Sequence, residues 1–293
     1  MKEAFKSGKY SRFFLQKDFD FSRNSSIGCG GVAPIAFFPN NVEELNVLIE
    51  CLKQDGIRYC ILGNLTNVLP PDGKVNFAVI STKRMQGVAV GGFIFASAGV
   101  TSGELLNVCR REKRSGAEFL KGIPCTLGGA LYMNAGAGGK YISEIVESVM
   151  VLREGKPHIL SLDECAYSYK QSVFMKNDDV ILGAYLKLPQ ATEKEIAEKE
   201  EYYSSRRQHL PKGRSMGCVF KNPPNTSAGM LIEEAGLKGF CLGGAKISEQ
   251  HANFIINEKK ATSKDVHALI ELANKEVKRK FDVCLEEEIR YLE

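Results

Sequence analysis

The chain has 293 residues, of which 44% are hydrophobic and 25% are charged, as in an ordinary soluble globular protein. Chains of this length usually divide into more than one hydrophobic core, so we expect two or three domains. The formal net charge is only +4. It gives no reason to expect a nucleic-acid partner, which usually needs a clustered basic face.

Apolar runs and cysteines narrow the class further. No run of 18 apolar residues occurs, so we expect no membrane span. Residues 1–19 lack the apolar core and cleavage site of a signal peptide. The nine cysteines are scattered and form no C-x-x-C pair, which predicts reduced thiols in a cytoplasmic protein and no metal site.

The first 82 residues have the pattern of an α/β unit. Apolar residues recur at helical spacing over residues 40–56, an asparagine precedes them, and Gly56 follows, which predicts a helix. The apolar runs 57–63 and 77–82 predict two buried strands after this helix. We interpret these elements as part of a strand–helix–strand unit, which favours α/β organisation. We therefore expect a first domain over residues 1–82.

Between residues 83 and 190 the pattern changes to hairpins, and we expect a second domain. The predicted elements are two short strands about a Gly91-Gly92 turn, a helix over 102–113 capped by Ser102, a hairpin over 146–162 turning at Glu154 to Lys156, and a strand over 179–188.

A charged helix over residues 191–209 is a natural connector into a third domain, 191–293. Apolar spacing predicts the elements that follow it, which are a helix over 227–236, a strand over 253–257, a helix over 263–281 and a strand over 285–292.

Two loops suggest a ligand site. Residues 122–139 are rich in glycine and carry no charge, so their backbone N–H groups can wrap a phosphate. A tight turn beside a closely packed helix selects the same residues, and spacing alone does not decide between them. Residues 62–73 place Thr66 and Asn67 where a strand ends, a common ligand position in α/β proteins. A plain polar turn is the alternative there.

Several motifs, in order, resemble those of UDP-N-acetylenolpyruvoylglucosamine reductases from about residue 20 to the C-terminus. "LGNLTNVL" (62–69) is similar to the family's L-G-G-G-S-N-L-L loop, and "GIPCTLGGALYMNAGAGG" (122–139) to its G-I-P-G-T-V-G-G-A…N-A-G-A-Y-G stretch. "YSYKQSVF" (167–174) is similar to Y-R-x-S, and "GCVFKNP" (217–223) to G-S-x-F-K-N-P. The chain shows no tyrosine-bearing insertion, so it resembles the shorter, second type of the family.

The resemblance implies a mixed α+β and α/β fold. In it, a two-part FAD-binding module (1–82 and 83–190) precedes a smaller α/β substrate domain (191–293), whose last strand returns towards the flavin cleft. It also implies a reaction of peptidoglycan synthesis. NADPH reduces bound FAD, which passes hydride to the enolpyruvyl group of UDP-N-acetylglucosamine enolpyruvate and yields UDP-N-acetylmuramate. We expect a cytoplasmic monomer whose partners are the UDP-sugar substrate and NADPH.

The resemblance also assigns site residues. Cys218 stands at the family's proton-donating serine, Glu288 at its acidic partner and Lys170 at its arginine. Residues matching substrate-facing positions are Lys221, Asn222 and Ser172. Residues matching the flavin loops are Gly63, Asn64, Leu65, Thr66, Asn67, Gly122, Ile123, Pro124, Cys125, Thr126, Gly128, Gly129, Asn134, Ala135 and Gly136.

The chain departs from the family pattern at several of these positions. Lys170 keeps the positive charge of arginine without its bidentate fork. Leu65 and Cys125 replace glycines, and Gly138 replaces a tyrosine. These changes motivate an alternative, a non-catalytic paralogue that binds flavin or a UDP-sugar as a sensor or scaffold. A different FAD oxidoreductase is a third hypothesis, against which the "GCVFKNP" motif argues.

Each catalytic assignment has a structural alternative. Cys218 is of a residue type that commonly fills cores. Glu288 lies in a run of three glutamates that a solvated face would also explain. Alternation along a strand puts Glu286 on the same face as Glu288, which weakens a choice between them. Lys170 and Ser172 have the alternative of an exposed strand edge.

Overall fold

The structure, a computed structural model, describes residues 8–292. These residues divide into two compact units. Unit 1 comprises the residues up to Gln16, Ile35–Asn64 and Phe77–Gln208; unit 2 comprises Lys17–Pro34, Leu65–Asn76 and the residues from His209 on. Both units are therefore built from segments that lie far apart in the sequence.

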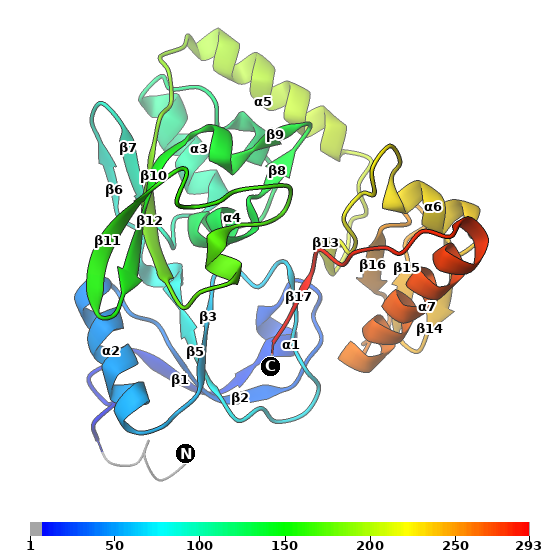
Figure 1. The fold of residues 1–293 in the computed structure, drawn as a ribbon, viewed down its shortest axis with the longest axis horizontal. Coiled ribbons are helices and arrows are strands. Elements are labelled where there is room, and N and C mark those ends of the chain that lie inside the picture. The colour runs from blue at the N-terminus through cyan, green and yellow to red at the C-terminus, as the bar shows by residue number, and fades with distance from the viewer. Residues whose placement is uncertain (1–7, 293) are drawn as a thin grey trace. The chain divides into compact units, whose positions relative to one another are not determined.

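Unit 1 contains the predicted helix and the two predicted strands that follow it (Figure 1). Helix α2 (Val42–Gln54) begins where the Asn41 side chain accepts a hydrogen bond from the Glu44 N–H, and it buries Leu45, Leu48 and Leu52. Strands β3 (Tyr59–Leu62) and β5 (Ala78–Ser81) run parallel, which confirms this part of the prediction.

The sheet containing these strands has the order β1-β2-β5-β3. Strand β1 (Leu15–Asp20) starts in unit 1 and continues into unit 2, where the short helix α1 (Phe21–Asn24) follows it. Strand β2 (Val32–Phe37) passes from unit 2 back into unit 1 and pairs with β5 in parallel.

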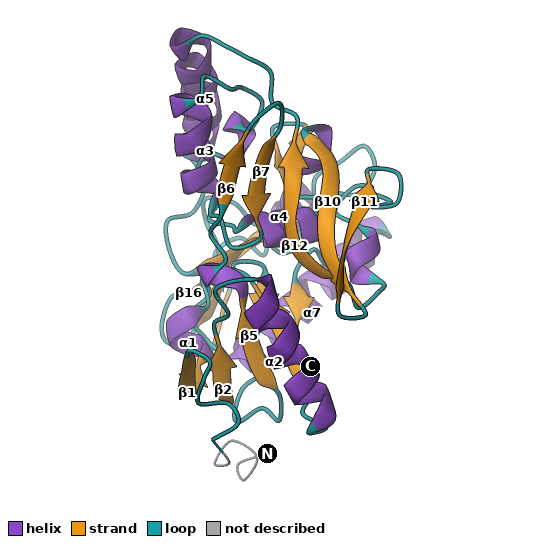
Figure 2. Cartoon of the chain, turned by 90° about the vertical axis from the view of Figure 1, so that its left-hand side faces the viewer, coloured by secondary structure: helices purple, strands orange, loops and turns teal. Residues whose placement is uncertain are grey.

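The second sheet of unit 1 is antiparallel and has the order β11-β10-β12-β7-β6, as Figure 2 shows. Both predicted hairpins are present. The strands are β6 (Val88–Val90), β7 (Ile94–Ser97), β10 (Val146–Arg153), β11 (Lys156–Ser161) and β12 (Val180–Leu186). Helix α4 (Leu127–Met133) packs against β12 and β7. Its Leu127 and Leu131 are buried in the hydrophobic core that this helix shares with the sheet.

Helix α3 (Ser102–Arg111) follows β7. Thr101, not Ser102 as predicted, is its N-cap, because the Thr101 side chain accepts a hydrogen bond from the Glu104 N–H and completes a capping box. Adjacent Ser and Thr residues are both good caps, so the sequence alone does not choose between them.

Helix α5 (Glu193–Arg207) is the predicted charged helix, but it packs within unit 1. We expected it to open the third domain, whereas Ile196 and Glu200 are buried and Glu200 pairs with Arg110 of α3. A helix with so few apolar residues does not reveal from its sequence which side packs.

Unit 2 has an antiparallel sheet in the order β13-β16-β15-β14. Its strands are β13 (Ser215–Cys218), β14 (Cys241–Leu242), β15 (Ala245–Ile247) and β16 (Phe254–Asn257), and its helices are α6 (Ala228–Glu234) and α7 (Ser263–Phe281). Leu231 of α6 and Leu269 of α7 are buried in the core of this unit.

The last predicted strand, 285–292, is largely wrong as a regular element. Only Arg290–Tyr291 forms a strand, β17, which pairs in parallel with β4 (Val68–Leu69). Further upstream the segment makes one isolated bridge, between Glu287 and Phe220. An alternating sequence predicts extended backbone, but it does not identify the partner that would make the pairing continuous.

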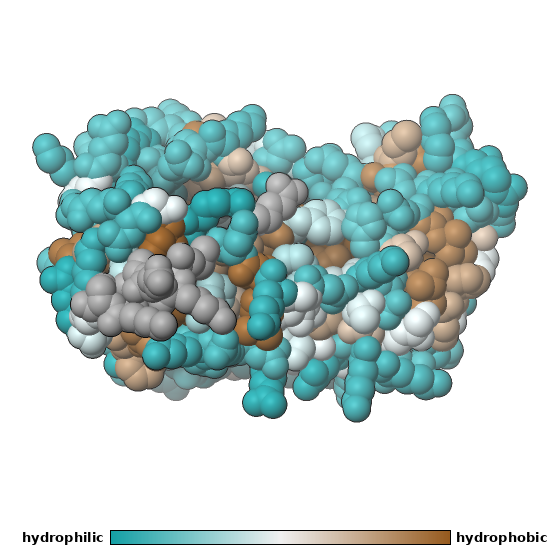
Figure 3. Space-filling view, turned by 90° about the horizontal axis from the view of Figure 1, so that it is seen from below, coloured by the Kyte–Doolittle hydropathy of each residue, from teal (hydrophilic) through white to brown (hydrophobic). Residues whose placement is uncertain are grey.

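None of the helices within residues 8–292 is both long and apolar enough to cross a membrane. Hydrophilic residues cover most of the face drawn in Figure 3, with apolar patches between them.

Candidate functional site

Two of the predicted flavin loops touch within unit 1. The Asn64 side-chain amide donates a hydrogen bond of 2.7 Å to the Pro124 carbonyl. A Cβ on Gly63 would lie 2.2 Å from the Thr126 Oγ1, a distance that real Cβ atoms do not tolerate. Glycine is therefore required where the loop after β3 meets the loop before α4.

The second of these loops leads into α4 with short, uncharged side chains. Thr126 is buried and caps the helix, since its Oγ1 accepts a hydrogen bond from the Gly129 N–H at 3.4 Å. Gly122 and Pro124 are exposed, and Gly128 and Gly129 are half-buried. Short side chains here leave little between a ligand and the backbone, although the N–H groups of Ile123, Cys125, Leu127 and Gly128 already donate to carbonyls of the chain.

The far end of α4 is tied to the segment that contains Lys170. Asn134 ends the helix with a φ of +44°, and its amide nitrogen donates to the Ser168 carbonyl at 2.8 Å. The buried Ser172 hydroxyl donates to the Tyr132 carbonyl at 2.7 Å. Both side chains thus serve the structure, and their contacts with ligands remain predictions.

Lys170 lies in a tight turn between these two anchors. An isolated bridge joins Ser168 to Gln171, and Lys170 itself has a φ of +55°. Its side chain is half-buried. The turn is held on both sides, so the position of the Lys170 backbone relative to α4 is fixed.

The remaining predicted residues of the second loop follow α4. Ala135 donates its N–H to the Ala130 carbonyl. Gly136 starts a short hairpin of β8 (Gly136–Ala137) and β9 (Lys140–Tyr141). A Cβ on Gly136 would lie 2.3 Å from the Lys140 carbonyl oxygen, so this position also requires glycine.

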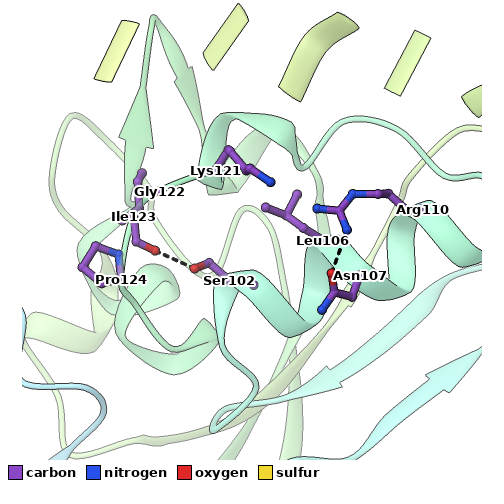
Figure 4. Close-up of a pocket in the computed structure, with 9 residues that line it drawn as sticks. Ser102, Leu106, Asn107, Arg110, Lys121, Gly122, Ile123 and Pro124 are labelled. Carbon is purple, nitrogen blue, oxygen red and sulfur yellow. Dashed lines mark hydrogen bonds between the residues drawn. The ribbon is translucent and has the colours of Figure 1, made fainter. Parts of the chain in front are cut away.

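A pocket of about 370 Å³ adjoins the beginning of this loop (Figure 4). Its walls are α3 and residues 121–124. The Ser102 hydroxyl donates to the Ile123 carbonyl at 2.5 Å, and Arg110 donates to the Asn107 side chain at 2.7 Å. The first of these bonds holds the loop against α3, and the second lies within the helix.

The structure shows what surrounds three of the residues that depart from the family pattern. Leu65 is buried and has a φ of +51°, a conformation that favours glycine. Burial raises the pKa of the Cys125 thiol to about 11, so it is a neutral, small side chain. At Gly138, the Tyr203 ring of α5 lies 3.0 Å from where a Cβ would be, so an aromatic ring from another element occupies that space.

In unit 2, the segment containing Cys218 is held from one side by Asn253. Cys218 ends β13, pairs with Phe254 and is half-buried. Gly217 before it has a φ of +79°. The buried Asn253 side chain accepts a hydrogen bond from the Phe220 N–H at 2.9 Å and donates to the Phe220 carbonyl at 2.8 Å. These two bonds fix the backbone two residues after the thiol.

The glutamate run lies along the other side of this segment. The Lys221 N–H donates to the Glu286 carbonyl at 2.8 Å, and the Glu288 N–H donates to the Val219 carbonyl at 2.7 Å. The Lys221 ammonium also forms an ion pair with the Glu286 carboxylate. The structure therefore brings the segments of three predicted residues together, namely Cys218, Lys221 and Glu288.

Asn67 and Asn222 also belong to unit 2. Asn67 donates its side-chain amide to the Glu288 carbonyl at 3.0 Å. Asn222 is exposed, and its side-chain oxygen accepts a hydrogen bond from the Ala228 N–H at 3.1 Å, at the start of α6. Thr66 is half-buried in the turn between Leu65 and Asn67.

Sequence reasoning did not assign roles to two residues that organise this segment. Asn253 lies in the stretch "HANFIIN", which reads as a strand, and nothing in that pattern signals a bond to Phe220. Glu286 was visible only through its alternation with Glu288. Within the part of the chain that the structure describes, no group of three or more His, Cys, Asp or Glu residues could hold a metal ion.

Comparison with known proteins gives two family matches. Residues 208–292 match the family described as UDP-N-acetylenolpyruvoylglucosamine reductase, C-terminal domain. Residues 33–161 match the family described as FAD binding domain.

Relatives match along the whole chain. A UDP-N-acetylenolpyruvoylglucosamine reductase of Caldanaerobacter subterraneus is 40% identical over 99% of this chain and 96% of its own length. That of Caldicellulosiruptor bescii is 38% identical over 97% and 92%. The crystal structure of the Thermus caldophilus enzyme is similar with a TM-score of 0.82 and 32% identity, over 96% of this chain and 99% of that one.

Proposed function

Because this chain belongs to the UDP-N-acetylenolpyruvoylglucosamine reductase family, we propose that it reduces the enolpyruvyl group of UDP-N-acetylglucosamine enolpyruvate to give UDP-N-acetylmuramate. The cofactor is FAD and the reductant is NADPH. The observation that carries this assignment is the full-length match, which includes an FAD-binding domain and the reductase C-terminal domain. The match to the reductase C-terminal domain also argues against an unrelated FAD oxidoreductase.

The residues of unit 1 fit an FAD molecule. The contact between Gly63 and Thr126 leaves no room for a side chain, and exposed backbone at Gly122 and Pro124 lies beside it. We assign the flavin nucleotide to residues 62–64 and 122–136 of this unit, where close approach to the backbone and the Asn64 side chain would hold it. When bound, FAD supplies the two-electron chemistry, since it accepts hydride from NADPH and delivers it to the terminal alkene carbon of the substrate.

The chain itself must manage charge and a proton. Reduction of the alkene places negative charge on the carbon and carboxylate next to it, so positive groups there lower the barrier. We assign this role to Lys170, with Lys221 and Asn222 holding the substrate and Ser172 supporting the turn. The carbon that carries the carboxylate then needs a proton, which we assign to the Cys218 thiol. Water returns a proton to the thiolate. Glu288 lies in the segment that pairs with residues 219–221, directly after Cys218.

Anaerobic spectroscopy tests the proposal. Purified protein incubated with FAD should show a flavin absorbance band that NADPH bleaches and that the enolpyruvyl nucleotide restores, with UDP-N-acetylmuramate as the product detected by mass spectrometry. A protein that binds flavin but is not reoxidised by the nucleotide would support the sensor alternative. A protein that binds no flavin would overturn the proposal.

We further propose that the protein is a monomer of the cytoplasm. The scattered cysteines without a C-x-x-C pair support the compartment. Light scattering of the FAD-bound protein tests the monomer, and fractionation of the source cells tests the compartment.

A further inference from the structure

Lys221 is a cation with little access to water. Its side chain is 10% exposed, whereas that of Glu286, its ion-pair partner, is 67% exposed. An ammonium removed from water needs a partner of opposite charge or several acceptors. The exposed Glu286 carboxylate provides that partner.

The two residues are joined by their backbones as well as by their charges. The Lys221 N–H donates to the Glu286 carbonyl, and the Glu288 N–H donates to the Val219 carbonyl. Phe220 and Glu287 lie directly opposite each other between these bonds. Phe220 and Glu287 therefore form a non-hydrogen-bonded pair of antiparallel strands, in which opposed side chains come close together.

The pairing also determines which side chains share a face. Directly opposed residues lie on the same side of a pair of strands, and residues two apart on one strand do so as well. Lys221 is opposite Glu286, and Glu288 is two residues from Glu286. The ion pair therefore lies on the same face as Glu288, and Glu287 lies on the other.

We infer that Glu286 is a positioning residue for the substrate, which acts through Lys221. The carboxylate of Glu286 fixes the direction of the Lys221 ammonium, so that this cation is presented to an anionic group of the nucleotide substrate with little loss of side-chain freedom. This inference rests on the proposed function, in which Lys221 binds the substrate. It assigns a role to the first glutamate of the run that is distinct from that of Glu288.

Two substitutions of Glu286 and one control test the inference. Glu286→Gln keeps the shape and removes the charge, and Glu286→Asp keeps the charge on a shorter stem. The control is Glu287→Gln, in the same run, where the carboxylate accepts a hydrogen bond from the exposed Tyr291 hydroxyl instead. The measurements are the dissociation constant of the enolpyruvyl nucleotide by calorimetry, both half-reactions by stopped-flow spectroscopy, and the melting temperature.

Glu286→Gln should weaken nucleotide binding by about tenfold or more, the usual effect of losing a hydrogen bond to a charged group. Flavin reduction by NADPH should stay at the wild-type rate. Glu286→Asp should recover part of the affinity, and Glu287→Gln should bind as the wild type does. Lys221→Ala combined with Glu286→Gln should bind no more weakly than Lys221→Ala alone, because residues that act through one another are not additive.

Wild-type affinity in Glu286→Gln would overturn the inference. So would losses that add in the double variant, or an equal slowing of both half-reactions together with a lower melting temperature, which would indicate a structural role. Failure of the proposed function is a separate result, because the wild-type protein itself would then not be reoxidised by the nucleotide.

Discussion

Asn67 holds Glu288 by its backbone across 221 positions of sequence. The side-chain amide of Asn67 donates to the Glu288 carbonyl at 3.0 Å, and the Asn67 carbonyl accepts a hydrogen bond from the Arg290 N–H at 2.9 Å. A residue predicted to bind the cofactor thus also fixes the segment of a residue predicted to act in catalysis.

Replacing Asn67 should therefore affect substrate reduction as well as stability. Asn67→Ala should lower the free energy of unfolding by about 1 kcal/mol, the net value of one hydrogen bond. Asn67→Asp should lower it further, because its carboxylate would face the Glu288 carbonyl oxygen. Urea titration gives the stability, and stopped-flow reoxidation should slow in the same order. The same reoxidation rate in Asn67→Asp and wild type, at saturating FAD, would contradict this coupling.

Cys218 is testable through its thiol proton. Cys218→Ser restores the hydroxyl usual in the family and should keep substantial activity. Cys218→Ala should fold, bind FAD and be reduced by NADPH, yet be reoxidised by the nucleotide about 10²–10⁴-fold more slowly, as expected for loss of a general acid. Reoxidation of Cys218→Ala at the wild-type rate would mean that the thiol only fills space.

Lys170 should affect one half-reaction more than the other. In the proposed mechanism the Lys170 ammonium stabilises the developing enolate. Lys170→Ala should therefore slow flavin reoxidation by the nucleotide more than flavin reduction by NADPH. Both rates come from the same stopped-flow experiment. Equal slowing of the two would exclude this role. Lys176→Ala, a few residues beyond the turn, is a suitable control for loss of a lysine charge.

Leu65 offers a test of backbone strain. It is buried with a φ of +51°, so Leu65→Ala should cost about 2–5 kcal/mol for the lost side chain. Leu65→Gly loses the same contacts but relieves about 1–2 kcal/mol of left-handed strain. The glycine variant should therefore be the more stable of the two in urea unfolding.

A buried leucine on regular strand backbone provides the control for that comparison. Leu62 ends β3 and is also buried. There glycine adds only backbone freedom to the unfolded chain, so Leu62→Ala should be more stable than Leu62→Gly. The same order of alanine and glycine at both positions would show that Leu65 is unstrained.

Glu200 predicts a dependence of stability on pH. Burial raises the pKa of Glu200, but hydrogen bonds from Arg110 and Lys121 together outweigh burial and leave the pKa below its ordinary value. A carboxyl whose folded pKa is lowered stabilises the protein above its unfolded pKa of about 4.3, and this stabilisation disappears as the pH falls through the folded value. Glu200→Gln should accordingly lose less stability than wild type between pH 6 and pH 3.5 in urea titrations. Glu198→Gln, on the exposed side of the same helix, should follow the wild type.

Local pattern predicted most of the elements and some of the site. The helix over residues 42–54 and the hairpin of β10 and β11 follow from apolar spacing and turn residues that act over a few positions. The resemblance to a family supplied Cys218 and Glu288. Neither source predicted that Glu286 pairs with Lys221, or that Asn253 binds both backbone groups of Phe220. Such contacts depend on where distant segments meet, and a single sequence does not encode that in any local period.

The pairing of β4 with β17 has a consequence for synthesis on the ribosome. Val68 and Leu69 leave the ribosome long before their partners Arg290 and Tyr291 are made. Likewise, the Ile27 and Gly28 carbonyls can accept hydrogen bonds from the Asn257 side chain only after that residue has been made. Unit 1 is complete once Gln208 has emerged, whereas unit 2 needs Lys17–Pro34 and Leu65–Asn76 together with the residues from His209 on. Nascent chains should therefore protect unit 1 from protease well before unit 2, and the early segments of unit 2 are the ones that a chaperone would meet exposed.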